Sequence, residues 1–69
     1  MTKYEETKNM LTTSQVARLF NVHAATVRRW SRQGILKAYI VGSHAEKRFR
    51  RDDVAILFLE KAVNKHEED

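Results

Sequence analysis

The chain has 69 residues and no cysteine, which allows one domain with a small core and excludes disulfide bonds and thiolate metal sites. Its longest apolar run, Val54 to Leu59, is too short to cross a membrane, and residues 1–10 lack the apolar stretch of a signal peptide, so we expect a cytoplasmic location. The charge is uneven: the span from Arg18 to Arg51 has nine Lys or Arg and one acid, Glu46, whereas the remainder has four basic and eight acidic residues. This favours a polyanionic partner, although a solvated charged surface would give the same charge count.

Residues 1–9 are polar and lack periodicity, so we expect a flexible arm. The fold then opens at Thr12, whose hydroxyl can accept from the start of a helix while Gln15 reaches back, as in a capping box. The apolar side of that helix is formed by Val16, Ala17, Leu19 and Phe20. The helix is predicted to end at Asn21, which tolerates the left-handed conformation.

A second helix is predicted over about residues 24–33, with Gly34 as its left-handed end. Only Asn21, Val22 and His23 separate the two helices, and so short a connection forces a steep crossing, as in a helix-turn-helix. We expect the apolar Val22 to lie between the helices. His23 is a weak residue for starting the second helix.

The pattern then changes to that of a strand pair. Residues 37–41 are rich in β-branched and aromatic side chains, and Gly42 with Ser43 indicates a turn. Residues 47–50 alternate, so Phe49 should point inward while its two arginine neighbours point outward. The result is a basic hairpin. Its one acid, Glu46, would face the phosphates of a polyanionic partner unfavourably unless it pairs with a neighbouring arginine.

Asp52 and Asp53 suit the positive first turn of a last helix, which we expect to continue over residues 54–64. The predicted domain is therefore 10–64, followed by a charged tail at 65–69. The fold class is mostly α with a small β-hairpin, and comprises three helices and a two-stranded wing.

The second helix has two contrasting faces. At about 100° per residue, one face holds Ala25, Arg28, Arg29 and Arg32, and the opposite face holds Ala24, Val27 and Trp30. An arginine can bridge two acceptors on a guanine edge or clamp a phosphate, and a major groove admits one α-helix. A generic solvated face usually mixes Glu with Lys, yet no acid occurs between Asn21 and Ala45. We interpret the arginine face as reading DNA, and we expect Trp30 to pack in the core rather than stack on a base.

The sequence resembles the MerR-like winged helix-turn-helix family, especially its short excisionase-type branch. The resemblance is carried by residues 11–17 (LTTSQVA), 22–30 (VHAATVRRW), 34–36 (GIL) and 47–54 (KRFRRDDV), and covers about residues 10–59. It implies sequence-specific binding of double-stranded DNA, as a small transcriptional regulator or a recombination factor associated with the nucleoid.

The same resemblance implies which residues contact DNA. Thr26, Arg28, Arg29 and Arg32 would contact DNA from the second helix, Lys47 and Arg48 from the wing, and Thr13 and Ser14 would hold a phosphate at a helix start. Together with Ala25 on the reading face and Arg50 on the hairpin, these are the expected DNA-binding residues.

An enzyme is the first alternative, and we do not expect one. The three histidines, His23, His44 and His66, fall in a turn, a wing and a tail, without metal-ligand spacing. No nucleophile and base are grouped as catalysis requires. We therefore expect no catalytic residue, no metal and no cofactor.

A protein-interaction module is the second alternative. On the last helix, Val54, Leu57 and Phe58 can face the core, while Ile56, Leu59 and Val63 form a second apolar stripe. Either Tyr4 and Met10 fold back over this stripe, or another protein chain covers it. That chain would be a second copy bound on DNA, or a recombinase or polymerase component that the last helix docks to.

Overall fold

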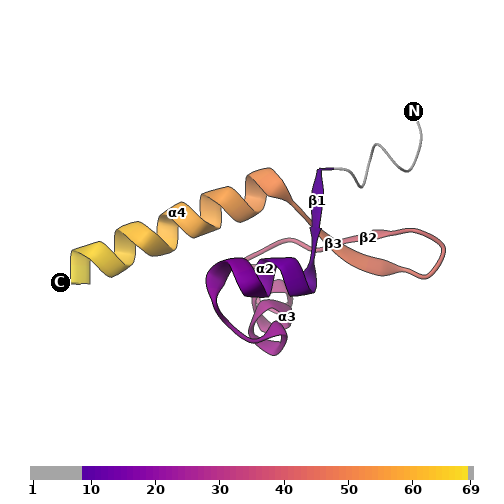
Figure 1. The fold of residues 1–69 in the computed structure, drawn as a ribbon, viewed down its shortest axis with the longest axis horizontal. Coiled ribbons are helices and arrows are strands. Elements are labelled where there is room, and N and C mark those ends of the chain that lie inside the picture. The colour runs from indigo at the N-terminus through magenta and orange to yellow at the C-terminus, as the bar shows by residue number, and fades with distance from the viewer. Residues whose placement is uncertain (1–8, 69) are drawn as a thin grey trace.

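The computed structural model describes residues 9–68, which form three helices and a three-stranded sheet (Figure 1). In chain order the elements are β1 (Met10–Thr12), α2 (Thr13–Phe20), α3 (Ala24–Arg32), β2 (Tyr39–Val41), β3 (Glu46–Arg50) and α4 (Arg51–Glu68). Helices α2 and α3 pack together on one side of the sheet, and α4 extends away from it. The predicted winged helix-turn-helix fold is confirmed.

Helix α2 begins and ends as its sequence predicts. The Gln15 amide donates to Thr12 Oγ1 at 3.1 Å, and the Thr12 amide donates to Gln15 Oε1 at 2.9 Å, which completes the capping box. At the other end, Asn21 is left-handed, with φ 60° and ψ 47°. Its amide and that of Val22 donate to carbonyls of the last turn, which closes the helix.

Helix α3 follows after the predicted three-residue turn. Val22 is half-buried and packs against the core between the helices, as expected. His23 occupies the N-cap position in an extended conformation, but its side chain makes no capping hydrogen bond. Gly34, at φ 77°, takes the left-handed conformation predicted for the end of this helix.

The sheet contains the predicted hairpin and one strand that was not predicted. Strands β2 and β3 are antiparallel, with Tyr39 opposite Arg48, and the turn between them closes where the Ala45 amide donates to the Gly42 carbonyl at 3.3 Å. Strand β1 also pairs with β3, with Leu11 opposite Phe49, so the strand order is β1-β3-β2. The predicted hairpin forms the two-stranded wing, and β1 adds a third strand to the sheet.

A single core joins the helices to the sheet. Its buried side chains come from every helix, from β3 and from the segment before β2: Val16, Ala17, Val27, Trp30, Leu36, Phe49, Val54 and Leu57. Phe49 is fully buried, as the alternation along its strand predicted. This core holds α3 against the sheet and thereby sets the position of the wing relative to that helix.

Helix α4 is longer than predicted. It starts at Arg51, has Asp52 and Asp53 in its first turn, and runs to Glu68, past the expected end near residue 64. The Arg51 amide donates to the Asn9 carbonyl at 3.2 Å, so the helix start is joined to the residue before β1. The arm predicted over residues 1–9 lies outside the described residues except for Asn9. No helix within residues 9–68 is long and apolar enough to cross a membrane.

The two apolar sides of α4 differ in burial. Val54 and Leu57 are in the core, and Phe58 meets the Phe20 ring edge-on at 5.4 Å while keeping 44% of its surface exposed. On the other side, Ile56, Leu59 and Val63 (hereafter the α4 stripe) stay 54–63% exposed. Met10 does not cover this stripe, because it lies in β1 opposite Arg50. Tyr4 lies outside the described residues.

Candidate nucleic-acid interface

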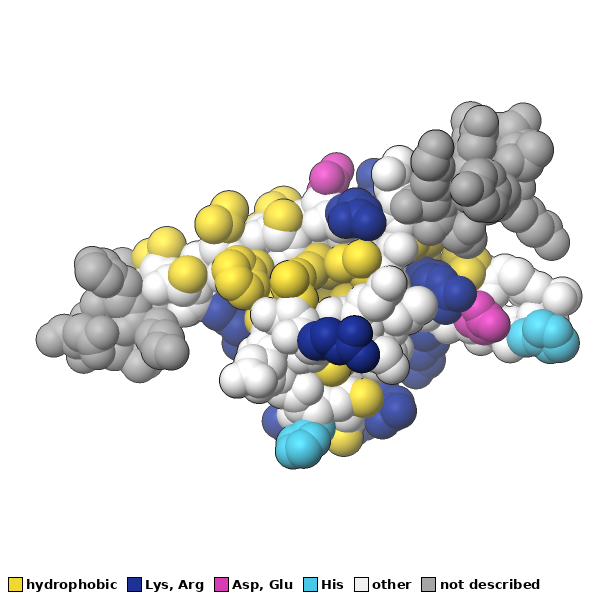
Figure 2. All heavy atoms as spheres, viewed as in Figure 1, with side chains coloured by type: hydrophobic (Ala, Val, Ile, Leu, Met, Phe, Trp, Pro, Cys, Tyr) yellow, Lys and Arg dark blue, Asp and Glu magenta, His cyan; other side chains and the backbone are white. Residues whose placement is uncertain are grey.

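The outer face of α3 carries the predicted arginines. Arg28, Arg29 and Arg32 are all exposed, and so is Ala25 among them, while Thr26 is half-buried. Figure 2 shows Lys and Arg side chains gathered around α3 and at the base of the hairpin. Since Glu46 is the only acid between Arg18 and Arg51, this surface is strongly positive.

The inner face of α3 anchors that arginine face. Val27 is fully buried and Trp30 is 8% exposed, which confirms that Trp30 is a core residue. The Phe20 ring meets Trp30 edge-on at 5.1 Å, and Lys61 Nζ lies 4.7 Å from the centre of the Trp30 ring. Contacts from both α2 and α4 therefore hold α3 in one orientation.

The wing, which is the β2–β3 hairpin, presents three basic side chains from one strand. Lys47 and Arg50 are exposed, and Arg48 is half-buried. Arg48 Nη2 lies 2.6 Å from Glu46 Oε1, which confirms that Glu46 pairs with a neighbouring arginine. The two residues are two positions apart on one strand and therefore share a face, which makes the pair possible.

The start of α2 lies beside the wing. In the sheet, Thr12 is the register partner of Arg48, so Thr13 and Ser14 follow directly from a residue adjacent to the wing strand. Ser14 is exposed and Thr13 is half-buried. A helix start offers unpaired backbone amides and a positive dipole end. The structure thus joins two of the predicted phosphate-contacting groups, which are separated by more than thirty residues in sequence.

The two histidines whose side chains the structure describes lie on different parts of the fold. His23 is exposed at the start of α3, and His44 is exposed in the turn of the hairpin. Among the described residues, no three His, Cys, Asp or Glu side chains are grouped as metal ligands would be. His66 lies where the structure describes only the backbone.

The comparison with known families agrees with this geometry. Residues 10–62 match the family model described as the helix-turn-helix domain. The chain belongs to this helix-turn-helix domain family. Over 47 residues, 68% of the chain, it is 43% identical to a protein named transcriptional repressor DcmR from Methylorubrum extorquens. The matched part is 18% of that repressor, so the chain spans less than a fifth of its relative's length. No solved structure gives a significant match.

Family membership supports DNA binding by this domain. The MerR-like and excisionase-type assignments are finer than the family match, and neither comparison names them.

Proposed function

We propose that this domain binds double-stranded DNA in a sequence-specific way and acts as a small transcriptional regulator. One observation carries the proposal: the second helix of a helix-turn-helix has an exposed, acid-free arginine face, and its opposite face is locked into the core. Clustered arginines do not stabilise a helix whose outer face only contacts solvent, because like charges at helical spacing repel each other. The arginine face therefore calls for a functional explanation.

In the proposed complex, α3 lies in the major groove. An α-helix with its side chains is about 10–12 Å in diameter, which matches a groove roughly 12 Å wide. Ala25 lets the backbone approach the base edges closely. Arg28, Arg29 and Arg32 then reach guanine edges or flanking phosphates with their planar, forked donors.

The wing and the start of α2 would position the helix. Lys47, Arg48 and Arg50 lie on a strand next to the end of β1, so the basic wing and the amides at Thr13 and Ser14 can hold neighbouring phosphates. Phosphate contacts set the register of a protein on the duplex but carry no sequence information. In this proposal α3 therefore determines the sequence specificity, and the wing contributes affinity for DNA of any sequence.

The named relative supports regulation by occupancy. A transcriptional repressor shares 43% identity over 47 residues with this chain, which favours blocking or recruiting polymerase at a bound site over chemistry on a substrate. We infer a regulator that is not an enzyme and needs no cofactor. A MerR-like, excisionase-type factor that bends DNA for a recombinase would use the same contacts, and no observation favours that role over regulation.

The test is selection of binding sites from a random duplex library at near-physiological salt, with excess competitor DNA. We expect a motif of a few base pairs, because one module of this size contacts few of them. Arg28→Ala should cost about 1–3 kcal/mol on that motif and relax one position. Lys47→Ala is the matched control, and it should weaken binding to all sequences alike. Equal, sequence-independent losses in both variants would rule out direct readout by α3.

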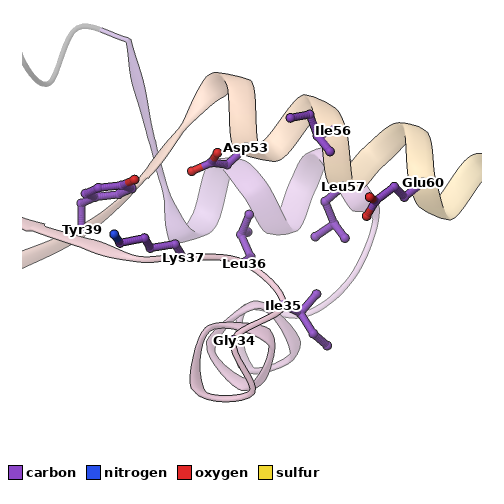
Figure 3. A pocket seen from close by; sticks show the side chains of 9 residues that line it. All are labelled: Gly34, Ile35, Leu36, Lys37, Tyr39, Asp53, Ile56, Leu57 and Glu60. Atoms are coloured by element: carbon purple, nitrogen blue, oxygen red, sulfur yellow. The ribbon is translucent and has the colours of Figure 1, made fainter.

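A second candidate function is contact with another protein chain through α4, and the exposed α4 stripe favours it. Figure 3 shows that a groove adjoins this stripe, where Ile35 and Leu57 face each other between α4 and the segment after α3. Ile35 is 47% exposed and Ile56 is 56% exposed. Contiguous apolar surface of this kind usually marks a partner site. The partner would be a second copy on DNA, or a polymerase or recombinase component.

A further inference from the structure

The side chain of Arg48 is held within the wing itself. Its Nη2 atom lies 2.6 Å from Glu46 Oε1, and its Nη1 donates to the Lys47 carbonyl at 3.3 Å. Among residues 9–63, whose side chains the structure describes, this is the only ion pair. The arginine is 24% exposed and the glutamate 51% exposed, so the pair lies at the surface and remains accessible to a ligand.

The sheet keeps the two charges next to each other. Positions 46 and 48 are two residues apart on β3 and therefore share a face. Both are in register with β2, where Arg48 lies opposite Tyr39 and Glu46 lies opposite Val41. The strand geometry therefore keeps both residues on one face, where their side chains pair.

We propose that Glu46 limits the attraction of the wing to DNA of any sequence. This inference rests on the proposed DNA binding and assigns a role to the one acid within the basic span. The carboxylate balances the charge of Arg48, so on the face of β3 that residues 46, 48 and 50 share, Arg50 keeps the uncompensated positive charge. A balanced pair displaces few condensed counterions from DNA, and counterion release supplies most sequence-independent affinity.

The test measures the affinity of the purified domain for a random-sequence duplex across a range of salt concentrations. Each phosphate that a protein charge neutralises contributes about 0.9 to the slope of log affinity against log salt. Glu46→Gln frees Arg48 to neutralise one more phosphate. We therefore expect the slope to steepen by about 0.9, with a severalfold gain in affinity at low salt.

Two further variants separate this effect from a general change in charge. Glu60→Gln, at an exposed position on α4, removes the same negative charge away from the wing and should leave the slope unchanged. The double variant Glu46→Gln/Arg48→Ala should lose the gain that Glu46→Gln produces. The inference is overturned if Glu46→Gln matches Glu60→Gln, or if the gain survives without Arg48. Failure of the unmodified domain to bind any duplex would instead remove the proposed DNA binding.

Discussion

At the scale of single residues, Phe49 links the core to the wing. It is fully buried, while Arg48 and Arg50 on either side of it point to the other face of β3. The same strand therefore supplies both a core anchor and the basic surface of the wing. Because side chains alternate along a strand, a shift of the register by one residue would bury an arginine and expose the phenyl ring.

Replacing Phe49 by Ala should be severely destabilising. Truncation of a buried Phe costs about 3–5 kcal/mol, which is comparable to what a core of this size supplies. We expect Phe49→Ala to be largely unfolded at 25 °C in a circular dichroism melt. Ile40→Ala is the matched control on the same sheet, since Ile40 is 60% exposed, and it should cost less than about 1 kcal/mol. Similar melting of the two variants would contradict the role of Phe49 as a core anchor.

Burial on α3 and at Phe49 was predictable from periodicity, whereas Leu19 and Phe58, which periodicity also placed on apolar faces, stay 52% and 44% exposed. Side-chain pairing was less predictable. The two faces of α3 and the inward side of Phe49 follow from the periods of a helix and a strand, which are local properties. The pair between Glu46 and Arg48 needs a side-chain rotamer as well as a shared face. Whether an arginine meets a carboxylate two residues away depends on its χ angles, which the sequence does not specify.

At the scale of elements, the two helices of the motif start differently. Thr12 caps α2 with its hydroxyl, whereas His23 at the same position of α3 has a suitable backbone, φ −77° and ψ 153°, but no capping hydrogen bond. The Thr26 amide donates to the His23 carbonyl at 2.9 Å, but the His23 side chain accepts from no amide of the first turn. Helix α3 therefore lacks one stabilising interaction that α2 has.

His23→Ser should stabilise the domain by supplying this cap. A Ser N-cap is worth about 0.5–2 kcal/mol over a residue that cannot cap. For a domain of this size, 1 kcal/mol corresponds to roughly 4–8 °C in Tm, so a thermal melt resolves the gain. Thr12→Ala serves as the opposite control and should lower Tm by a similar amount. If Thr12→Ala is destabilising and His23→Ser has no effect, the start of α3 is already satisfied in another way.

The ends of α2 and α3 were predictable because they depend on neighbouring residues. Strand β1 was not, because it depends on a strand far away in the sequence. The capping box and the left-handed Asn21 and Gly34 identify the helix ends. Strand β1 has three residues, too few to show alternation, and it forms only because β3 lies beside it nearly forty residues later. Helix α4 passes its predicted end because the charged segment after Asn64 contains neither Gly nor Pro to stop it.

At the scale of the whole molecule, charge and apolar surface are divided between parts of the fold. The basic side chains surround α3 and the wing, and exposed apolar side chains lie along α4 (Figure 2). In a domain with so small a core, apolar side chains left at the surface contribute little to its own stability. In the proposed complex with DNA, the division would leave α4 available for a protein contact.

This arrangement predicts self-association through α4. If two copies bury their α4 stripes against each other, apolar surface is removed from water. This burial would stabilise the dimer by about 25 cal/mol for each Å² buried. Sedimentation equilibrium at tens of micromolar protein should therefore give an average mass above the 8.1 kDa of one chain. Ile56→Ser/Leu59→Ser should return it to the mass of one chain, whereas Ile40→Ser, which exposes a comparable polar group on β2, should not.

The same measurement separates the two partners considered for the stripe. A second copy would be excluded by two results together. The free unmodified domain would have the mass of one chain, and copies bound to a duplex with two adjacent sites would not associate with each other. The stripe would then be available to a different protein, because none of the described residues covers it. If two copies associate only on the duplex, DNA raises their local concentration, and the Ile56→Ser/Leu59→Ser variant should lose cooperative binding while keeping its affinity for a single site.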